Sequence, residues 1–332
     1  MEIACIHIGL MKTATTYMQG AWTLDEKIAL SNKGLNPVVE YLRESTAGNR
    51  FDAGKNLNID LDQPLKAGQS LVLSNEGLSC GFLDSGDAEM LRIYQDNASI
   101  MMGTLASQTQ NVLITFRSPV SWIRSMHAQF LNEGGSGSAS EFLSERRAFL
   151  LQCLDLDYLL GLYRRYFRNV RILPYEALRE GEDDFWASLG EIFNMPVPTV
   201  RDVPASNPSL SGQRLYVLSC LNGLGGHMRS VLQHSESYVG LEQERLVQVS
   251  SHYESWLNRR FVEHASEAEL EQTLGWLRAD TVPDDFRRFS ISREFADELE
   301  KRYLSVVEEV TGDTKLVSRY RDELQQAITE PV

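Results

Sequence analysis

Residues 3–19 run Ile3-Ala-Cys-Ile-His-Ile-Gly9-Leu-Met-Lys12-Thr-Ala-Thr-Thr-Tyr-Met-Gln19. The apolar run that ends at Ile8 predicts a buried strand, and the residues from Gly9 onward predict a tight turn and the start of a helix. Such a turn points several backbone N–H groups and the positive end of the helix dipole at one place. Lys12 adds a full positive charge there. The segment therefore predicts a binding site for a phosphate group.

The loop is shorter than the phosphate loop of nucleotide-hydrolysing enzymes, whose pattern is G-x-x-x-x-G-K-[ST]. Only two residues separate Gly9 from Lys12, and Met11 stands where the second glycine would be. A loop of this length does not wrap the β- and γ-phosphates of a triphosphate, so we expect it to hold one terminal phosphate. The alternative is a capped helix start with an exposed lysine. Hydroxyl donors next to Lys12 are Thr13, Thr15 and Thr16.

The composition is that of a globular chain of 332 residues, 42% of them hydrophobic, long enough for one large α/β domain or two smaller ones. A formal net charge of −14 argues against nucleic acid as a partner, because such binding neutralises phosphates with Lys and Arg. The four cysteines form no C-x-x-C pair, so we expect reduced thiols and no metal site. The N-terminal apolar run is too short for a signal peptide. No apolar run has the length of about 18 residues that a membrane-spanning helix needs. We therefore expect a soluble, cytoplasmic protein.

Short apolar strands alternate with helical patterns up to about residue 195. This alternation predicts an α/β fold of three layers, with a central parallel sheet and helices on both faces. Because ligands of such sheets bind beyond the carboxyl ends of the strands, the loops after Ile8, Ser74 and Phe116 are predicted to gather at one edge. We expect strands at 3–8, 34–42, 70–74, 111–116 and 170–173, and helices at 15–30, 87–106, 120–131 and 154–167.

Residues beyond 195 have a different composition, with several prolines followed by mainly helical patterns at 241–261, 265–277 and 292–311. We therefore expect an α/β core at 1–195 and a mainly helical C-terminal part at 196–332. The two parts are expected to pack together as one domain.

A second candidate phosphate site follows the strand at 111–116, where the sequence is Arg117-Ser-Pro-Val-Ser-Trp-Ile-Arg-Ser125. Pro119 suits the first turn of a helix, where its missing N–H is not needed. Arg117 at the strand end and Ser125 two turns into the helix are placed to contact one ligand along the helix start. Taken alone, Arg117 is equally compatible with a structural ion pair.

The segment Lys12-Thr-Ala-Thr-Thr16 resembles the 5′-phosphosulfate loop of sulfotransferases, whose pattern is K-[ST]-[GSA]-[ST]-[ST]. Arg117, with Ser125 eight residues later, resembles the 3′-phosphate motif of the same family. The resemblance covers about residues 2–195. Weaker similarities are Ser74-Asn-Glu76-Gly-Leu78 and Pro174-Tyr-Glu176-Ala-Leu178.

The resemblance implies a P-loop nucleotide-kinase-like fold that binds 3′-phosphoadenosine 5′-phosphosulfate and passes its sulfuryl group to an acceptor hydroxyl. Lys12 is placed to stabilise the charge that develops on the departing 5′-phosphate, and the reaction requires no metal. Most members have Pro before this lysine, so Met11 predicts a less rigid turn. The expected donor contacts are Lys12, Thr13, Ala14, Thr15, Thr16, Arg117 and Ser125.

The acceptor needs a general base at the same edge of the sheet. Glu76, directly after the strand at 70–74, is the first candidate, because many carbohydrate sulfotransferases use a carboxylate from the equivalent loop. A surface glutamate, or a carboxylate that pairs with Lys12, is the alternative role for this residue. His127, on the helix after Arg117, is the second candidate base.

The sequence leaves the acceptor open between a polysaccharide, a glycolipid, a small alcohol and a protein tyrosine, with a carbohydrate or small molecule as the main expectation, and it does not indicate an oligomeric state. Two other functions remain. A P-loop small-molecule kinase would need a second glycine before Lys12 and an Asp at a strand end, and the sequence has neither. A non-catalytic nucleotide-binding protein of the same fold is the other alternative.

Overall fold

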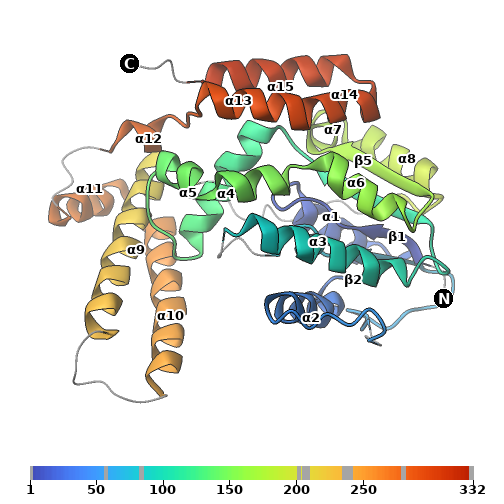
Figure 1. Ribbon diagram of the computed structural model, residues 1–332, viewed down its shortest axis with the longest axis horizontal. Helices are drawn as coiled ribbons and strands as arrows, with labels where there is room; N and C mark the ends of the chain where they lie inside the picture. Colours follow the sequence, from blue (N-terminus) through green and yellow to red (C-terminus); the bar gives the residue numbers. More distant parts are fainter. Residues whose placement is uncertain are drawn as a thin grey trace. The chain divides into compact units, whose positions relative to one another are not determined.

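The computed structural model describes residues 3–55, 59–81, 86–199, 203, 210–233, 242–277 and 282–328 (Figure 1). The chain forms two compact units. The first consists of Met1–Trp122, Ala148–Asn207 and Glu294–Gln326, and the second of Ile123–Arg147, Pro208–Arg293 and Ala327–Val332. The sequence predicts a division near residue 195, whereas the segment Glu294–Gln326 belongs to the first unit.

The first unit holds the strands β1 (Ile3–His7), β2 (Ile28–Ser31), β3 (Ser70–Ser74), β4 (Asn111–Phe116) and β5 (Asn169–Pro174). Its helices, wholly or mostly, are α1 (Thr15–Leu24), α2 (Asn36–Ala47), α3 (Ala88–Gly103), α6 (Leu156–Arg164), α7 (Tyr175–Glu180), α8 (Glu182–Phe193), α13 (Arg293–Leu299), α14 (Ser305–Thr311) and α15 (Thr314–Ala327). Shorter helical turns are η1 (Lys33–Leu35), η2 (Glu76–Leu78) and η3 (Glu300–Leu304). Two helices, α4 (Pro119–Asn132) and α5 (Ala139–Cys153), run from one unit into the other.

The five strands form one parallel sheet in the order β2-β3-β1-β4-β5. This confirms the predicted α/β class and the parallel sheet. The bounds of β3 and β4 coincide with the predicted strands, because each is a short apolar run between turn residues. β1 is the central strand, so its neighbours β3 and β4 bring their carboxyl ends to either side of the loop that follows β1.

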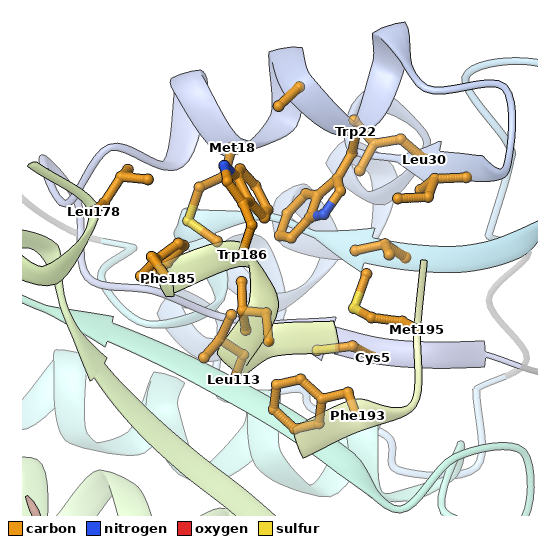
Figure 2. Packing of buried hydrophobic residues seen from close by; sticks show 14 residues of the cluster. Cys5, Met18, Trp22, Leu30, Leu113, Leu178, Phe185, Trp186, Phe193 and Met195 are labelled. Atoms are coloured by element: carbon orange, nitrogen blue, oxygen red, sulfur yellow. The ribbon is translucent and has the colours of Figure 1, made fainter. Parts of the chain in front are cut away.

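One face of the sheet is covered by α1 and α8, which meet over the strands in a cluster of large apolar side chains (Figure 2). Trp22 of α1 and Trp186 of α8 are fully buried, and their rings meet edge to face at 5.9 Å between centroids. Cys5 and Leu113 supply the strand side of this contact. Burying one such large side chain stabilises the fold by about 1.5–3 kcal/mol.

The other face is covered by α2, α3 and α6, which pack side by side, with α6 also against β5. The chain moves in opposite directions along the sheet from β1 to β2 and from β3 to β4, so right-handed crossovers carry α1 and α3 to opposite faces. The C-terminal helices also reach the sheet. The rings of Tyr303 in η3 and Tyr320 in α15 lie 6.3 and 6.5 Å from the ring of Phe116 at the end of β4.

The segment between the first strand and residue 47 differs from the prediction. The apolar spacing predicts a helix over 15–30, which begins at Thr15 as expected but ends at Leu24, with β2 after it. The strand predicted over 34–42 is wrong, because residues 36–42 lie in α2. The carboxylate of Asp25 ends α1 by accepting the N–H of Lys27 at 2.8 Å. Pro37 lies in the first turn of α2, where a proline favours a helix start. Residues 28–30 continue the apolar spacing of α1, so only their pairing with β3 distinguishes them as a strand.

The second unit is mainly helical where the structure describes it, as predicted for most of this part of the chain. It contains α9 (Gly212–Gln233), α10 (Glu242–His264), α11 (Glu267–Trp276) and α12 (Asp284–Arg287). Its core joins Leu131 of α4 to Val217, Val262 and Leu270. Among the helices that the structure describes in either unit, none has the length and apolar character needed to cross a membrane.

Candidate functional site at the carboxyl edge of the sheet

The loops that follow β1, β3 and β4 meet at the carboxyl edge of the sheet, as predicted. The guanidinium of Arg117, after β4, donates from Nη1 to the carbonyl of Lys12 at 3.3 Å. The hydroxyl of Thr15, at the start of α1, donates to Oε2 of Glu76, after β3. The chain leaves β1 toward one face of the sheet and leaves β3 toward the other, which is the arrangement that opens a crevice for a ligand in parallel α/β sheets.

The loop after β1 has an unusual backbone. Lys12 has φ 63° and Ala14 has φ 62°, and both are therefore in the left-handed region, although neither is glycine. This conformation costs a residue with a side chain about 1–2 kcal/mol. Alternating left-handed residues turn consecutive N–H groups toward a common point and form an anion-binding concavity. Ala14 is the N-cap of α1 and has no side-chain oxygen to accept an N–H of the first turn, so protein side chains do not fill this concavity from the cap position.

Hydrogen bonds from side chains hold the main chain of this loop. The indole N–H of Trp122, a buried residue of α4, donates to the carbonyl of Met11 at 2.7 Å. The hydroxyl of Thr13 donates to the carbonyl of Leu10 at 2.5 Å, and Arg117 holds the carbonyl of Lys12. The sequence predicts a less rigid turn because Met11 replaces a proline, but the tryptophan fixes that position from outside the loop.

A chain of buried side chains links β3, β1 and β4 beneath the loop. Thr13 gives its single hydroxyl proton to Leu10, so Thr115 donates to Thr13 at 2.7 Å. The imidazole Nε2 of His7 therefore carries the proton and donates to Thr115 at 3.1 Å. His7 Nδ1 then accepts from the hydroxyl of Ser74 at 2.9 Å.

This chain needs a neutral imidazole. Burial lowers the pKa of His7 to about 3, because the charged ring would lose its hydration without gaining a carboxylate partner. The sequence places His7 inside the first strand as a buried residue, and its exposure of 1% confirms this. It acts as a structural link and is too deep to act as a base on a ligand.

Gly9 is required by this packing. A Cβ at this position would lie 2.0 Å from Oγ1 of Thr115 and 2.7 Å from Nε2 of His7. The loop can therefore leave β1 directly above the buried hydrogen-bond chain only because residue 9 has no side chain.

Glu76 is the first residue of η2, and its position is fixed by its neighbours. The side chain of Asn75 caps this turn by accepting the N–H of Gly77 at 2.9 Å, and it donates to the carbonyl of Asn32 at 3.2 Å. Ser79, at the other end of the turn, donates to the carbonyl of Gly9 at 3.0 Å. Glu76 is half-buried and lies against the start of α1, as the prediction of a strand-end carboxylate requires. Its role as a base stays a prediction.

Arg117 is held on its main chain and on its side chain. The hydroxyl of Tyr303 donates to the carbonyl of Arg117 at 2.5 Å. The guanidinium lies over the ring of Tyr175, with 5.1 Å from Cζ to the ring centroid, a cation–π contact. The main-chain N–H of the next residue, Ser118, donates to the carboxylate of Glu176 at 3.1 Å. The sequence indicates Tyr175 and Glu176 only through a weak similarity, and it does not single out Tyr303.

The other residues predicted to contact the donor differ in their burial and in their hydrogen-bond partners. The hydroxyls of Thr13 and Thr15 are directed to protein partners, so these two residues would contact a ligand through their main-chain N–H groups, whereas Thr16 is exposed. Ser125 is half-buried on α4, in the part of that helix that belongs to the second unit. The site described above is therefore built from the first unit alone.

His127, the second candidate base, also belongs to the second unit. Its ring is 4% exposed, donates from Nε2 to the carbonyl of Gly137 at 3.2 Å, and packs against the rings of Phe142 and Phe286. Burial lowers its pKa, with the Gly137 carbonyl acting in the opposite direction. These contacts are those of a packed core histidine.

No protein-family model matches the chain, and no curated protein matches its sequence. Within the described ranges, no group of three or more His, Cys, Asp or Glu side chains is arranged to hold a metal ion. The geometry of the site and the sequence resemblance are therefore the observations that bear on function.

Proposed function

We propose that this protein is a sulfotransferase that moves the sulfuryl group of 3′-phosphoadenosine 5′-phosphosulfate to a hydroxyl of a carbohydrate or small molecule. The observation that carries the proposal is the direct contact between the three predicted segments. Arg117 touches the loop of Lys12, and Glu76 touches the start of the helix that follows this loop. The central position of β1, with its anion-binding loop, favours a P-loop-like fold.

The residues present fit the two phosphates of this donor. The left-handed Lys12 and Ala14 shape a concavity of N–H groups suited to one terminal phosphate, in keeping with the short spacing from Gly9. Arg117 supplies a planar fork of donors, which suits the oxygens of a second phosphate. Ser125 completes the sequence motif for that phosphate.

The proposed reaction is an in-line transfer. The acceptor oxygen forms a bond to sulfur, the bond between sulfur and the bridging oxygen of the 5′-phosphate breaks, and adenosine 3′,5′-bisphosphate leaves with that bond's electron pair. Lys12 stabilises the negative charge on the departing oxygen. Glu76 takes the proton of the acceptor hydroxyl. The hydroxyl of Thr15 orients the carboxylate by donating to Oε2.

Ligand binding tests the proposal against its alternatives. We expect adenosine 3′,5′-bisphosphate to bind and to raise the melting temperature without Mg²⁺. Stabilisation only by ATP with Mg²⁺ would indicate a kinase instead. Arg117→Ala should weaken the binding of the bisphosphate, whereas Lys66→Ala, at an exposed lysine in the loop before β3, is the matched control and should not.

Turnover tests the chemistry. With a ³⁵S-labelled donor and a panel of carbohydrate and small-molecule acceptors, the wild-type protein should label at least one acceptor. Glu76→Gln should remove most of this activity while leaving the affinity for the bisphosphate unchanged. Binding without turnover across the whole panel would favour a non-catalytic nucleotide-binding protein, and loss of binding in Glu76→Gln would make Glu76 structural.

A further inference from the structure

The turn between β4 and α4 is held by a polar cluster from distant parts of the first unit. Glu176, in α7, accepts the N–H of Ser118 with Oε1 at 3.1 Å and the hydroxyl of Tyr320 with Oε2 at 2.5 Å. Glu323, in α15, accepts the hydroxyls of Ser118 and of Ser121, the latter at 3.3 Å. Glu176 therefore satisfies a main-chain donor that a helix start leaves unpaired, and Glu323 holds two side-chain hydroxyls at the same start of α4.

The C-terminal segment reaches Arg117 itself. Tyr303 follows Arg117 by 186 residues, is fully buried, and donates its hydroxyl to the carbonyl of Arg117. Burial raises the pKa of Tyr303, and the nearby carboxylate of Glu176 raises it further, so the hydroxyl keeps its proton and stays a donor. Burial likewise raises the pKa of Tyr320. The cluster is thus a set of fixed donors and acceptors around one turn of the backbone.

We propose that Tyr303, together with Glu176, is a positioning residue of the donor site that fixes the main chain of Arg117 and so aims its guanidinium. This inference rests on the proposed function, because Arg117 is there the ligand of the 3′-phosphate. The main chain of residues 117 and 118 is bound on both sides, its carbonyl by Tyr303 and its N–H by Glu176. The ring of Tyr175, the neighbour of Glu176, lies against the guanidinium of Arg117. Adjacent residues of α7 therefore orient the main chain and the side chain of Arg117.

The cluster also gives the C-terminal helices a function. In sequence they follow the second unit, and their patterns alone suggest an extension. Side chains of η3 and α15 form hydrogen bonds with Arg117 and Ser118, the first residues of the second predicted phosphate motif. η3 and α15 therefore act as part of the donor-binding core.

The test is Tyr303→Phe, which removes the hydroxyl and keeps the ring that packs on Phe116. The matched control is Tyr163→Phe, since Tyr163 is equally buried in the first unit and its hydroxyl has no hydrogen-bond partner among the residues that the structure describes. Calorimetry measures the dissociation constants of adenosine 3′,5′-bisphosphate and of adenosine 5′-monophosphate for each variant. A purely structural role would change both constants together.

We expect Tyr303→Phe to weaken binding of the bisphosphate by about three- to tenfold, the loss of one hydrogen bond, and that of the 5′-monophosphate by less than about twofold. The control should change neither. Equal weakening of both ligands, or no change in either, overturns the positioning role and leaves the proposed function intact. A wild-type protein that does not bind the bisphosphate overturns the proposed function, and the positioning role with it.

Discussion

The buried imidazole of His7 makes a quantitative prediction about stability and pH. The folded protein keeps this ring neutral, with a pKa of about 3 against an ordinary value of 6.5. Between these two values the unfolded chain binds a proton that the folded chain does not. The free energy of unfolding should therefore fall as the pH drops below 6.5, and this loss should end near pH 3.

The magnitude follows from the linkage relation. Each pH unit inside this window costs up to about 1.4 kcal/mol for one proton. Between about pH 7.5 and about pH 5 the loss through His7 amounts to about 2 kcal/mol. This is a large part of the stability of an ordinary domain, which is about 5–15 kcal/mol.

The assay is urea unfolding, followed by tryptophan fluorescence, of the wild type and of His7→Gln over this pH range. Glutamine keeps one donor and one acceptor for Ser74 and Thr115 but does not titrate. The variant will be less stable at neutral pH, and the difference between the two proteins should shrink by about 2 kcal/mol as the pH falls to about 5. His227→Gln, at an exposed position of α9, is the control and should run parallel to the wild type.

The reasoning would be refuted by curves for the wild type and His7→Gln that stay parallel through the window. Parallel curves would mean that the folded protein accepts a proton on His7 without cost. In that case the hydrogen-bond chain from Ser74 to Thr13 would have to exist with a charged ring in its centre.

Three further variants test the loop after β1. Gly9→Ala should lower the free energy of unfolding by about 1–3 kcal/mol, because its Cβ meets Thr115, and combining it with Thr115→Ala should cost less than the sum of the two single changes, measured by urea unfolding. Trp122→Phe removes the donor to Met11 and should destabilise by about 1 kcal/mol while weakening bisphosphate binding; a fully retained affinity would show that this bond does not shape the loop. Lys12→Ala should reduce turnover by on the order of 100-fold, and near-normal turnover of labelled donor would remove Lys12 from the chemistry.

The strands that lead into the site loops are the elements that the sequence predicts most closely. The strands at 70–74 and 111–116 are buried on both faces, so their composition alone separates them from helices. The loops after them carry Glu76 and Arg117, and the parallel topology brings such loops together without further information. In contrast, the sequence does not predict β2, because residues 28–30 fit a helix and a strand equally well until a pairing partner is known.

The contacts that stabilise the site were not predictable in the same way. Trp122, Tyr303 and Glu176 act through hydrogen bonds to backbone atoms of residues that are 58 to 186 positions away. Apolar periodicity does not record such partners, because a buried tryptophan or tyrosine has the same pattern whether its polar atom is bonded or not. The sequence signal that was available is chemical, since a buried Tyr or Trp generally needs a partner for its polar atom.

The balance of strain and support in the loop after β1 suggests a reason for these distant contacts under the proposed function. Two left-handed residues, Lys12 and Ala14, together cost about 2–4 kcal/mol. The hydrogen bonds from Trp122, Thr13 and Arg117 contribute about 0.5–1.5 kcal/mol each, a total comparable with that cost. For the proposed donor, we therefore expect the loop to have its binding conformation before the phosphate arrives, so that the free energy of binding is not consumed in ordering the loop. A sequence with the same loop but without these supports would have to order it on binding, and would bind the same phosphate more weakly.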